Sequence, residues 1–332
     1  MLTEKAKSKP AYGFYGRLSP DFPSQVIIDT TELCNLACIH CPHPDFKQSS
    51  HYSGRSQSPE LNQKMVDEIR EYGKGITQYI RYTGEGEPLL HRYIYDMMGY
   101  AVKNSGTMVT LTTNGTLLTE PRIEKILDMG IHVIDISTDA FKEDTYATIR
   151  VHGDLKIVRQ NIINLIRKNK ENGSKTKIIL SFIEQPQNAG EGPLFEQFWK
   201  DQGADYVVVR RLHSGAGAVK DLASVLALED AHKERTPCLY PWERIILNPR
   251  GELVFCPQDW VHGSVVANYA ETTVREVWKS EFYKNLREAH LCNKFGDHKF
   301  CGDCPDWKQT RWPDEGRSYA DMIEEFKKKE FE

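Results

Sequence analysis

Across residues 25–211, short apolar runs alternate with longer stretches in which apolar residues recur at helical spacing. Short runs bounded by polar residues predict strands, and the longer periodic stretches predict helices. The predicted strands are 26–28, 76–82, 108–112, 132–136, 177–182 and 206–209, and the predicted helices are 60–72, 93–103, 120–129, 155–169 and 194–202. This alternation is typical of a parallel sheet. A closed barrel needs about eight such units. We therefore predict an α/β fold with a partial, open (β/α)6 TIM-type barrel; a doubly wound open sheet is the alternative.

Polar residues, glycines and cysteines follow each predicted strand. These segments are 34–41, 83–88, 113–115, 137–140, 184–185 and 210–213, in strand order. Taken singly, each is ordinary turn chemistry, because Asn-Gly and Gly-x-Gly are common turn formers. Together they lie at the carboxyl end of the sheet, where β/α barrels build their sites. We expect the functional site there.

The first of these segments places Cys34, Cys38 and Cys41 at C-x-x-x-C-x-x-C spacing. Three thiols are one too few for a closed tetrahedral metal site or a fully ligated cubane cluster. One metal corner then stays open for a small molecule. The alternatives are an iron–sulfur cluster with one open iron, a zinc site completed by His40 or His43, and chance.

Composition narrows the class of protein. The chain has 332 residues and a net charge of -4, which argues against nucleic-acid binding through bulk charge. The basic residues 327–329 are flanked by glutamates and are interpreted as a solvated helix end. No apolar run approaches a membrane span and no secretion signal is present, so we expect a cytoplasmic protein. Because disulfides rarely persist there, eight cysteines in tight spacings indicate metal binding.

The second half of the chain carries a separate cysteine set. Apolar runs 245–247 and 253–255, joined by Asn-Pro-Arg-Gly, predict a β-hairpin, and residues 274–290 predict a helix. The cysteines around them are Cys238, Cys256, Cys301 and Cys304. Four thiols are a complete ligand set for a closed cluster or for structural zinc. We divide the chain into an N-terminal extension (1–24), a barrel core (25–212), a linker (213–236), a cluster-binding module (237–310) and a helical tail (311–332).

The cysteine loop, followed one unit later by Gly-Glu-Gly-Glu-Pro at 84–88, resembles the radical S-adenosylmethionine (SAM) superfamily. In that family three cysteines hold a [4Fe–4S] cluster and SAM chelates the fourth iron, usually in a partial barrel. One departure is His40, since the position before the last cysteine is often aromatic; planar imidazole can still line an adenine pocket. The resemblance implies SAM contacts from His40, Gly84, Glu85, Gly86, Glu87, Asn114, Ser137, Asp139 and Arg150.

The chemistry of the SAM contacts can be stated for the Gly-Glu-Gly-Glu-Pro loop and for Arg150. Glycines at 84 and 86 let backbone approach a ligand closely, and the loop's carbonyls and carboxylate can accept hydrogen bonds from the SAM ammonium group. Arg150 resembles an arginine that can pair bidentately with the SAM carboxylate. Its alternative is a surface ion pair with Glu143 or Asp144.

The second cysteine set resembles the SPASM and Twitch modules of radical SAM enzymes, which bind auxiliary [4Fe–4S] clusters. Because no cysteine follows Cys304, the short Twitch pattern with one cluster fits better, and it is similar to that of the aminocyclitol dehydrogenase of butirosin biosynthesis. Zinc remains the alternative at this site. Cys292 is left over. It is an inconsequential thiol, a hydrogen-atom donor of the kind found in radical SAM epimerases, or a cluster ligand that substitutes for another cysteine.

These resemblances imply an oxidoreductase. The 5′-deoxyadenosyl radical removes a substrate hydrogen, and the auxiliary cluster then accepts an electron, giving a dehydrogenase; epimerisation through Cys292, peptide modification and a zinc-binding scaffold are the alternatives. We expect a flavodoxin or ferredoxin as electron donor. Because residues 1–24 are too short for a leader-peptide domain, we expect a small-molecule substrate such as a sugar, an aminocyclitol or a nucleotide-linked sugar. Candidate polar contacts are Glu32, His43, Glu184, Arg210, Arg211 and His213.

Overall fold

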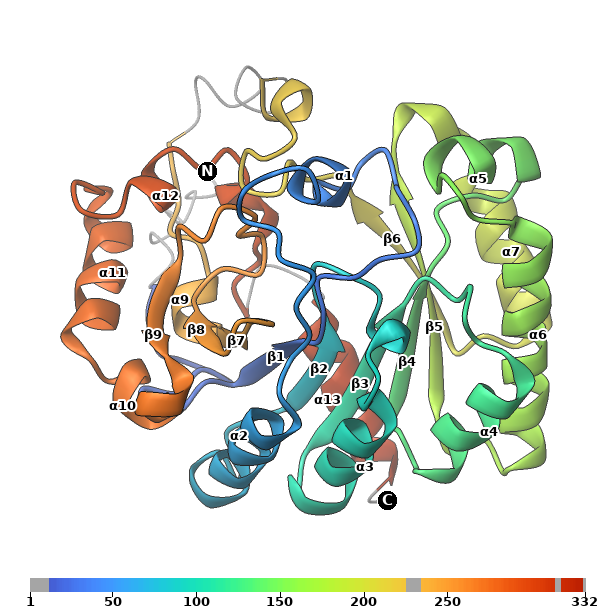
Figure 1. Ribbon diagram of the computed structural model, residues 1–332, viewed down its shortest axis with the longest axis horizontal. Helices are drawn as coiled ribbons and strands as arrows, with labels where there is room; N and C mark the ends of the chain where they lie inside the picture. The colour runs from blue at the N-terminus through green and yellow to red at the C-terminus, as the bar shows by residue number, and fades with distance from the viewer. Residues whose placement is uncertain (1–11, 225–233, 314–317, 331–332) are drawn as a thin grey trace, which may run out of the picture.

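The computed structural model describes residues 12–224, 234–313 and 318–330. Parts of the predicted extension, linker and tail (1–11, 225–233, 314–317 and 331–332) lie outside the described residues. Figure 1 shows the barrel strands and their helices on one side and the cysteine-rich module on the other.

The described strands form one sheet in the order β6-β5-β4-β3-β2-β1-β7-β8-β9. Their bounds are β1 (Gln25–Asp29), β2 (Tyr79–Thr83), β3 (Met108–Thr113), β4 (Val133–Ser137), β5 (Lys177–Glu184), β6 (Tyr206–Arg211), β7 (Arg244–Leu247), β8 (Glu252–Val254) and β9 (Val265–Asn268). Strands β1 to β6 pair in parallel with their neighbours in the chain. A doubly wound sheet would reverse its strand order at a switch point. The partial (β/α)6 barrel is confirmed.

Most of the helices cover the outer face of the barrel or flank the module, whereas the last helix packs against the inner face. Their bounds are α1 (His43–Phe46), α2 (Pro59–Tyr72), α3 (Ile94–Asn104), α4 (Glu120–Asp128), α5 (Glu143–Ile149), α6 (Leu155–Glu171), α7 (Gly192–Gln202), α9 (Tyr240–Glu243), α10 (Val274–Trp278), α11 (Glu281–Cys292), α12 (Lys299–Gly302) and α13 (Tyr319–Glu330). Single 3-10 turns are η1 (Pro88–Leu90), η2 (Pro186–Asn188), η3 (Tyr269–Glu271) and η4 (Trp307–Gln309).

Two elements differ from the sequence prediction. Strand β2 begins at Tyr79 and not at residue 76, because the amides of Ile76 and Thr77 turn back to the Gly73 carbonyl at 2.9 and 2.7 Å. The single helix expected over 274–290 is two helices, α10 and α11. The second begins after Ser280, whose hydroxyl accepts a hydrogen bond from the Tyr283 amide and caps it.

Each barrel strand places alternate side chains on its two faces. On β2, Ile80 and Tyr82 are fully buried toward the outer helices, and the Tyr82 hydroxyl donates to Asn62 of α2 at 2.7 Å. Tyr79 and Arg81 point to the inner face. The outer face therefore carries the main hydrophobic core, and the inner face is free to build a site.

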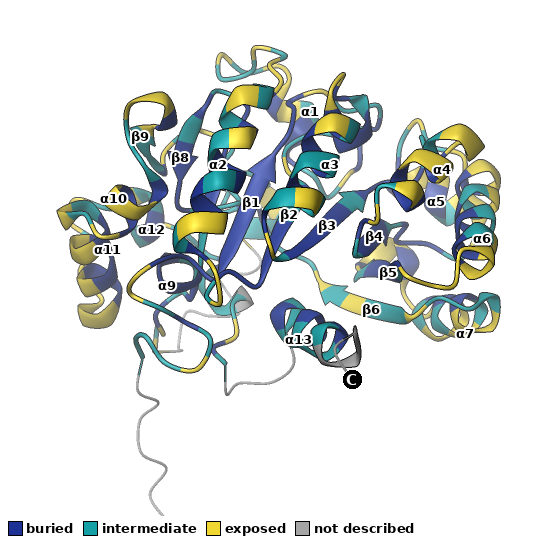
Figure 2. Cartoon of the chain, turned by 90° about the horizontal axis from the view of Figure 1, so that it is seen from below, coloured by how far each residue is buried: buried dark blue, intermediate teal, exposed yellow. Residues whose placement is uncertain are grey.

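Helix α13 closes the amino-terminal end of the inner face. Its buried residues Ala320, Met322, Ile323 and Phe326 pack against the starts of the strands at Tyr79, Met108, Val133 and Ile179. Figure 2 shows this helix on the side of the sheet opposite α2 and α3. The barrel interior thus has an apolar floor, and its carboxyl end stays open.

The cysteine-rich module continues the barrel sheet. Strand β7 pairs in parallel with β1, from Gln25 opposite Arg244 to Ile28 opposite Leu247. The predicted hairpin is confirmed as β7 and β8, which pair antiparallel. In its turn the Asn248 side chain accepts hydrogen bonds from the amides of Arg250 and Glu252, and Gly251 takes a φ of 80°.

Within the described part of the chain, no helix is long and apolar enough to cross a membrane.

Candidate active site

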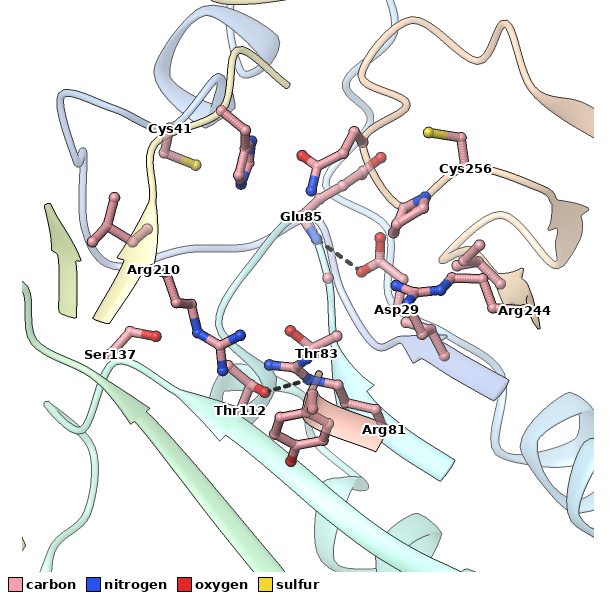
Figure 3. A pocket seen from close by; sticks show the side chains of 18 of the residues that line it. Asp29, Cys41, Arg81, Thr83, Glu85, Thr112, Ser137, Arg210, Arg244 and Cys256 are labelled. Carbon is pink, nitrogen blue, oxygen red and sulfur yellow. Dashed lines mark hydrogen bonds between the residues drawn. The ribbon is translucent and has the colours of Figure 1, made fainter. Parts of the chain in front are cut away.

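A cavity of about 920 Å³ opens at the carboxyl end of the barrel. Its walls include Cys34, Cys38 and Cys41 from the loop after β1 and Cys256 from the module. Figure 3 shows Cys41 and Cys256 on opposite sides of this space, with strand residues between them. Both cysteine sets therefore contribute to one cavity.

The cysteine loop is held by the segments that follow β3 and β4. The amides of Ala37 and Ile39 donate to the carbonyls of Val151 and Ile149, both at 3.0 Å. On its other side, the Asn35 amide group donates to the Thr116 hydroxyl at 2.8 Å. These bonds hold the segment between the thiols in place.

Gly84 and Gly86 allow two loops to touch. A Cβ at residue 84 would lie 1.7 Å from an Asp29 carboxylate oxygen, and one at residue 86 would lie 2.2 Å from the Leu33 carbonyl. Gly84 also has a φ of 134°, which side-chain-bearing residues rarely adopt. Both glycines line the cavity, but the close approaches that require them are to the end of β1 and to the segment just before Cys34.

Glu87 is a structural anchor within the same loop. It is 3% exposed, and its carboxylate accepts hydrogen bonds from the Thr113 hydroxyl at 2.7 Å and the Asn114 amide at 2.8 Å. The Asn114 side chain donates in turn to the Asn35 side-chain oxygen at 3.0 Å. The two predicted SAM contacts thus join the loops after β2 and β3 to the cysteine loop.

Arg150 and Asp139 form a buried ion pair beneath the cysteine loop. Asp139 is fully buried and also accepts a hydrogen bond from the Ile183 amide at 2.8 Å. Arg150 reaches Cys38 Sγ at 3.7 Å, so its partners are Asp139 and a thiol and not Glu143 or Asp144. Asp139 has a role that we did not expect from the sequence, since it supports Arg150 from behind the cavity wall.

His40 lies beside this pair. Its Nε2 is 3.6 Å from the Asp139 carboxylate, and its Nδ1 is 3.4 Å from the Gln185 amide nitrogen. Burial lowers the pKa of His40 to about 4, against the opposing effect of the Asp139 charge. The imidazole is therefore neutral at pH 7 and adds no charge to the cavity wall.

A carboxyl pair occupies the wall between the two cysteine sets. The Glu85 amide donates to Asp29 Oδ1 at 3.1 Å, as Figure 3 shows, and Glu85 Oε2 is buried without a hydrogen-bond partner among the described residues. Burial first, and then the Asp29 charge, raise the pKa of Glu85 to about 10. Burial also raises the pKa of Asp29. Glu85 is thus protonated at neutral pH.

The module encloses a second, smaller cavity of about 60 Å³. Cys238, Cys256, Cys301 and Cys304 all line it. So does His290, whose Nε2 is buried without a partner among the described residues. Asp306 anchors the segment after β6 to this module, since its carboxylate accepts from the Ser214 amide and hydroxyl at 3.0 and 2.9 Å.

Both thiol sets suit iron–sulfur clusters. All eight cysteines are free thiols. Burial raises the pKa of Cys34 to about 11, and that of Cys41 and Cys304 to about 12. Buried thiols give up these protons when they bind metal. The three-thiol set opens to a large cavity, whereas the four-thiol set surrounds a small one. Among the described residues, no three Cys, His, Asp or Glu side chains are gathered closely enough for a single metal ion.

The other candidate residues divide between the cavity and the core. Glu184, Arg210, Arg211 and His213 line the large cavity. Glu32 is fully buried and accepts the amides of Ser53 and Arg55, and His43 Nε2 lies 2.8 Å from the Glu32 carbonyl oxygen. Ser137 lines the cavity. Cys292 is exposed at the end of α11 and lines neither cavity.

Comparison with protein families identifies both halves of the chain. The radical SAM superfamily model matches residues 28–186, and the SPASM iron–sulfur cluster-binding domain model matches residues 238–305. The chain belongs to the radical SAM superfamily and carries a SPASM domain. The cofactors that these two domains define are a [4Fe–4S] cluster with SAM in the barrel and an iron–sulfur cluster in the module.

The relatives that the chain matches carry names for different activities. The chain is 25% identical over 186 residues to the tungsten-containing aldehyde ferredoxin oxidoreductase cofactor-modifying protein of Pyrococcus furiosus, covering 56% of this chain and 50% of the relative. It is 30% identical over 181 residues to the probable GTP 3′,8-cyclase of Methanocaldococcus jannaschii, covering 53% and 55%. The matches span about half the length of these relatives.

Solved structures share the fold over nearly the whole chain. BtrN in complex with AdoMet and 2-DOIA has a TM-score of 0.56 at 17% identity, covering 85% of this chain and 92% of BtrN. Streptococcus suis SuiB bound to S-adenosylmethionine has a TM-score of 0.64 at 15% identity, covering 92% and 75%. Native anSMEcpe with bound AdoMet has a TM-score of 0.61 at 14% identity, covering 92% and 96%.

Proposed function

We propose that the protein is a radical SAM dehydrogenase that oxidises a small polar molecule, such as a sugar or an aminocyclitol, with a [4Fe–4S] cluster at Cys238, Cys256, Cys301 and Cys304 as electron acceptor. When bound, the cluster at the first thiol set supplies the electron that cleaves SAM to methionine and a 5′-deoxyadenosyl radical, which removes a substrate hydrogen atom. The substrate radical then loses one proton and one electron, for instance to turn a secondary alcohol into a ketone.

The observation that carries this proposal is the shared wall of the two cavities. His213, Tyr240, Cys256 and Gln258 line both the large cavity and the four-thiol cavity. A molecule in the large cavity would lie between the three-thiol loop and the module. That position suits a substrate that meets the radical on one side and an electron acceptor on the other.

The size of the cavity supports a small substrate. Pockets for small molecules and cofactors span roughly 300–1,000 Å³. At about 920 Å³, this cavity has room for SAM and one small molecule. The BtrN complex, which holds AdoMet and 2-DOIA, shares the fold.

Peptide modification is the second candidate function. Its support is the likeness in fold to SuiB bound to precursor peptide SuiA, with a TM-score of 0.64 at 14% identity. Epimerisation gains no such support, because Cys292 lines neither cavity and is exposed at the end of α11.

Anaerobic reconstitution tests the cofactor content. Two cubane clusters bind about eight irons per chain, and reduction in the presence of SAM then releases 5′-deoxyadenosine. Cys34→Ala should abolish this release. If zinc fills both sites and iron stays at background, the enzyme proposal is refuted.

A paired variant tests the electron acceptor. Cys301→Ala with Cys304→Ala should lower the iron content to about four per chain and leave 5′-deoxyadenosine release in place, while oxidised product from a panel of polyols and aminocyclitols disappears. Cys292→Ala is the matched thiol control and should change neither iron content nor oxidation. Product formation that persists without the module cysteines would refute the acceptor role.

The supply of electrons completes the proposal. Free thiols in both sets need a reducing compartment, which supports a cytoplasmic location. A flavodoxin or a ferredoxin would deliver the electron to the first cluster.

A further inference from the structure

A cluster of two arginines and one aspartate, Arg81, Arg210 and Asp135, lies on the inner face of the barrel. Asp135 on β4 is 1% exposed and accepts hydrogen bonds from two arginines on its Oδ2. The Nη2 atoms of Arg81 and Arg210 donate at 3.0 and 2.7 Å. Two guanidinium groups against one carboxylate leave an excess of one positive charge.

Each arginine is held in place by hydrogen bonds and still has an N–H donor without a partner among the described residues. Arg81 Nε donates to the Thr112 hydroxyl at 2.8 Å, and Arg210 Nε donates to the Ser181 hydroxyl at 3.0 Å. Within the described residues, neither Nη1 has a hydrogen-bond partner. The side chains are 18% and 29% exposed, and both line the large cavity. Figure 3 shows the two guanidinium groups pointing toward one another inside it.

An aromatic ring supports the pair from below. The ring of Tyr319, at the start of α13, lies 4.5 Å from the Arg81 guanidinium carbon and 5.8 Å from that of Arg210. Stacking of this kind fixes the plane of a guanidinium group and leaves its edges free for hydrogen bonds. Beneath Tyr319 the floor is apolar. Both guanidinium groups lie next to the Tyr319 ring, and both arginines line the cavity.

The pair lies below the loop layer. Arg81 and Asp135 each come two residues before the last residue of their strands, Thr83 and Ser137. Two strand residues span roughly 6.5 Å. The cysteine loop and the Gly-Glu-Gly-Glu-Pro loop begin only after the strand ends, so Arg81 and Asp135 lie deeper than the residues expected to hold SAM. Arg210 is the next-to-last residue of β6, and its side chain reaches down to Asp135.

We propose that Arg81 and Arg210 form an oxyanion subsite that binds a carboxylate or phosphate group of the substrate. This inference rests on the proposed function, because it places the substrate in the same cavity. A planar or tetrahedral oxyanion offers several acceptor oxygens to the two Nη1 groups, and its charge offsets the excess that Asp135 leaves. The substrate class narrows to an acidic or phosphorylated small molecule.

The test measures anion binding to the reconstituted holoenzyme with SAM bound. Dissociation constants of inorganic phosphate and of malonate are determined by calorimetry at constant ionic strength, so that the two arms distinguish phosphate from carboxylate. Arg81→Gln and Arg210→Gln should each weaken the preferred anion about tenfold or more, since each removes charge-assisted hydrogen bonds. Arg167→Gln, which removes an exposed charge on α6, should leave it unchanged.

Asp135→Asn gives an effect of the opposite sign. It removes the negative charge next to the two arginines and so raises their net positive charge, and the anion should therefore bind more tightly to this variant than to the wild type. If Arg81, Arg210 and Asp135 had only a structural role, Asp135→Asn would bind the anion more weakly than the wild type or not at all. This variant keeps the proposal testable if an arginine variant fails to fold.

Three results would overturn the inference. These are no measurable binding of either anion to the wild type, affinities within twofold across the arginine variants, and a SAM affinity that falls by the same factor as the anion affinity. The last would assign the pair to SAM. Release of 5′-deoxyadenosine is measured in parallel. If the arginine variants weaken anion binding but no 5′-deoxyadenosine is released, the proposed function alone is refuted. If 5′-deoxyadenosine is released but the arginine variants bind the anion as the wild type does, the subsite alone is refuted.

Discussion

Replacing Arg150 with methionine removes one partner of the buried ion pair beneath the cysteine loop. Asp139 is fully buried, and its remaining amide donor is that of Ile183 at 2.8 Å. Breaking a buried pair from one side costs about 3–5 kcal/mol, because an uncompensated charge stays behind. Total stabilities of about 5–15 kcal/mol make this a large loss.

Urea unfolding of the metal-free protein, followed by tryptophan fluorescence, measures the effect. Arg167→Met is the control: this arginine pairs with Glu171 on the surface at 52% side-chain exposure, and its loss should cost less than about 1 kcal/mol. The double variant Arg150→Met with Asp139→Asn should cost less than the sum of its parts, since a neutral amide no longer needs the guanidinium. If Arg150→Met unfolds within about 1 kcal/mol of the wild type, or if the two effects add, the pair is not the buried, coupled unit described.

Three more predictions follow from other contacts. The folded-state pKa of Glu85 is raised to about 10, above its ordinary value of 4.5, so the contribution of Glu85 to folding stability is fully present below pH 4.5 and falls as the pH rises toward 10. Glu85→Gln should therefore make the melting temperature depend less on pH between pH 6 and 9. An unchanged pH dependence would contradict the raised pKa. Gly86→Ala should lower the iron bound on reconstitution, because its Cβ would meet the Leu33 carbonyl at 2.2 Å, whereas Gly99→Ala, with open space around it, should not. Phe326→Ala should cost about 3–5 kcal/mol in urea unfolding, and a cost below about 1 kcal/mol would show that α13 is not docked.

Local patterns were enough to predict the barrel strands, because buried parallel strands are continuous apolar runs. The pairing of β1 with β7 was not predictable in this way. Its two partners are far apart in the chain, and an apolar run does not specify its neighbour. The docking of α13 was missed for a related reason, since the charged residues 327–329 dominated the interpretation of that helix.

The cysteines of the site were predictable because their spacing is short and their chemistry is restrictive. Only one arginine of the pair, Arg210, was predicted as a candidate contact, because Arg81 lies inside an apolar run that was interpreted only as a strand. A signal was nevertheless present. Arg81 and Asp135 each interrupt a hydrophobic strand at an inward-facing position, and charged residues are rarely buried without a partner. Asp139 was placed in the right region, but its role depends on a contact with Arg150 that spacing does not reveal.

The parallel pairing of β1 with β7 also has a consequence for biosynthesis. Just before these strands, the Ser24 hydroxyl donates to the Glu243 carbonyl across 219 positions of the chain. During translation, the first strand emerges long before its partner and presents an unpaired edge until Arg244–Leu247 of β7 has also been made. A truncated chain that ends after β6 would keep that edge exposed. Shortened fragments should therefore aggregate where the full-length chain folds.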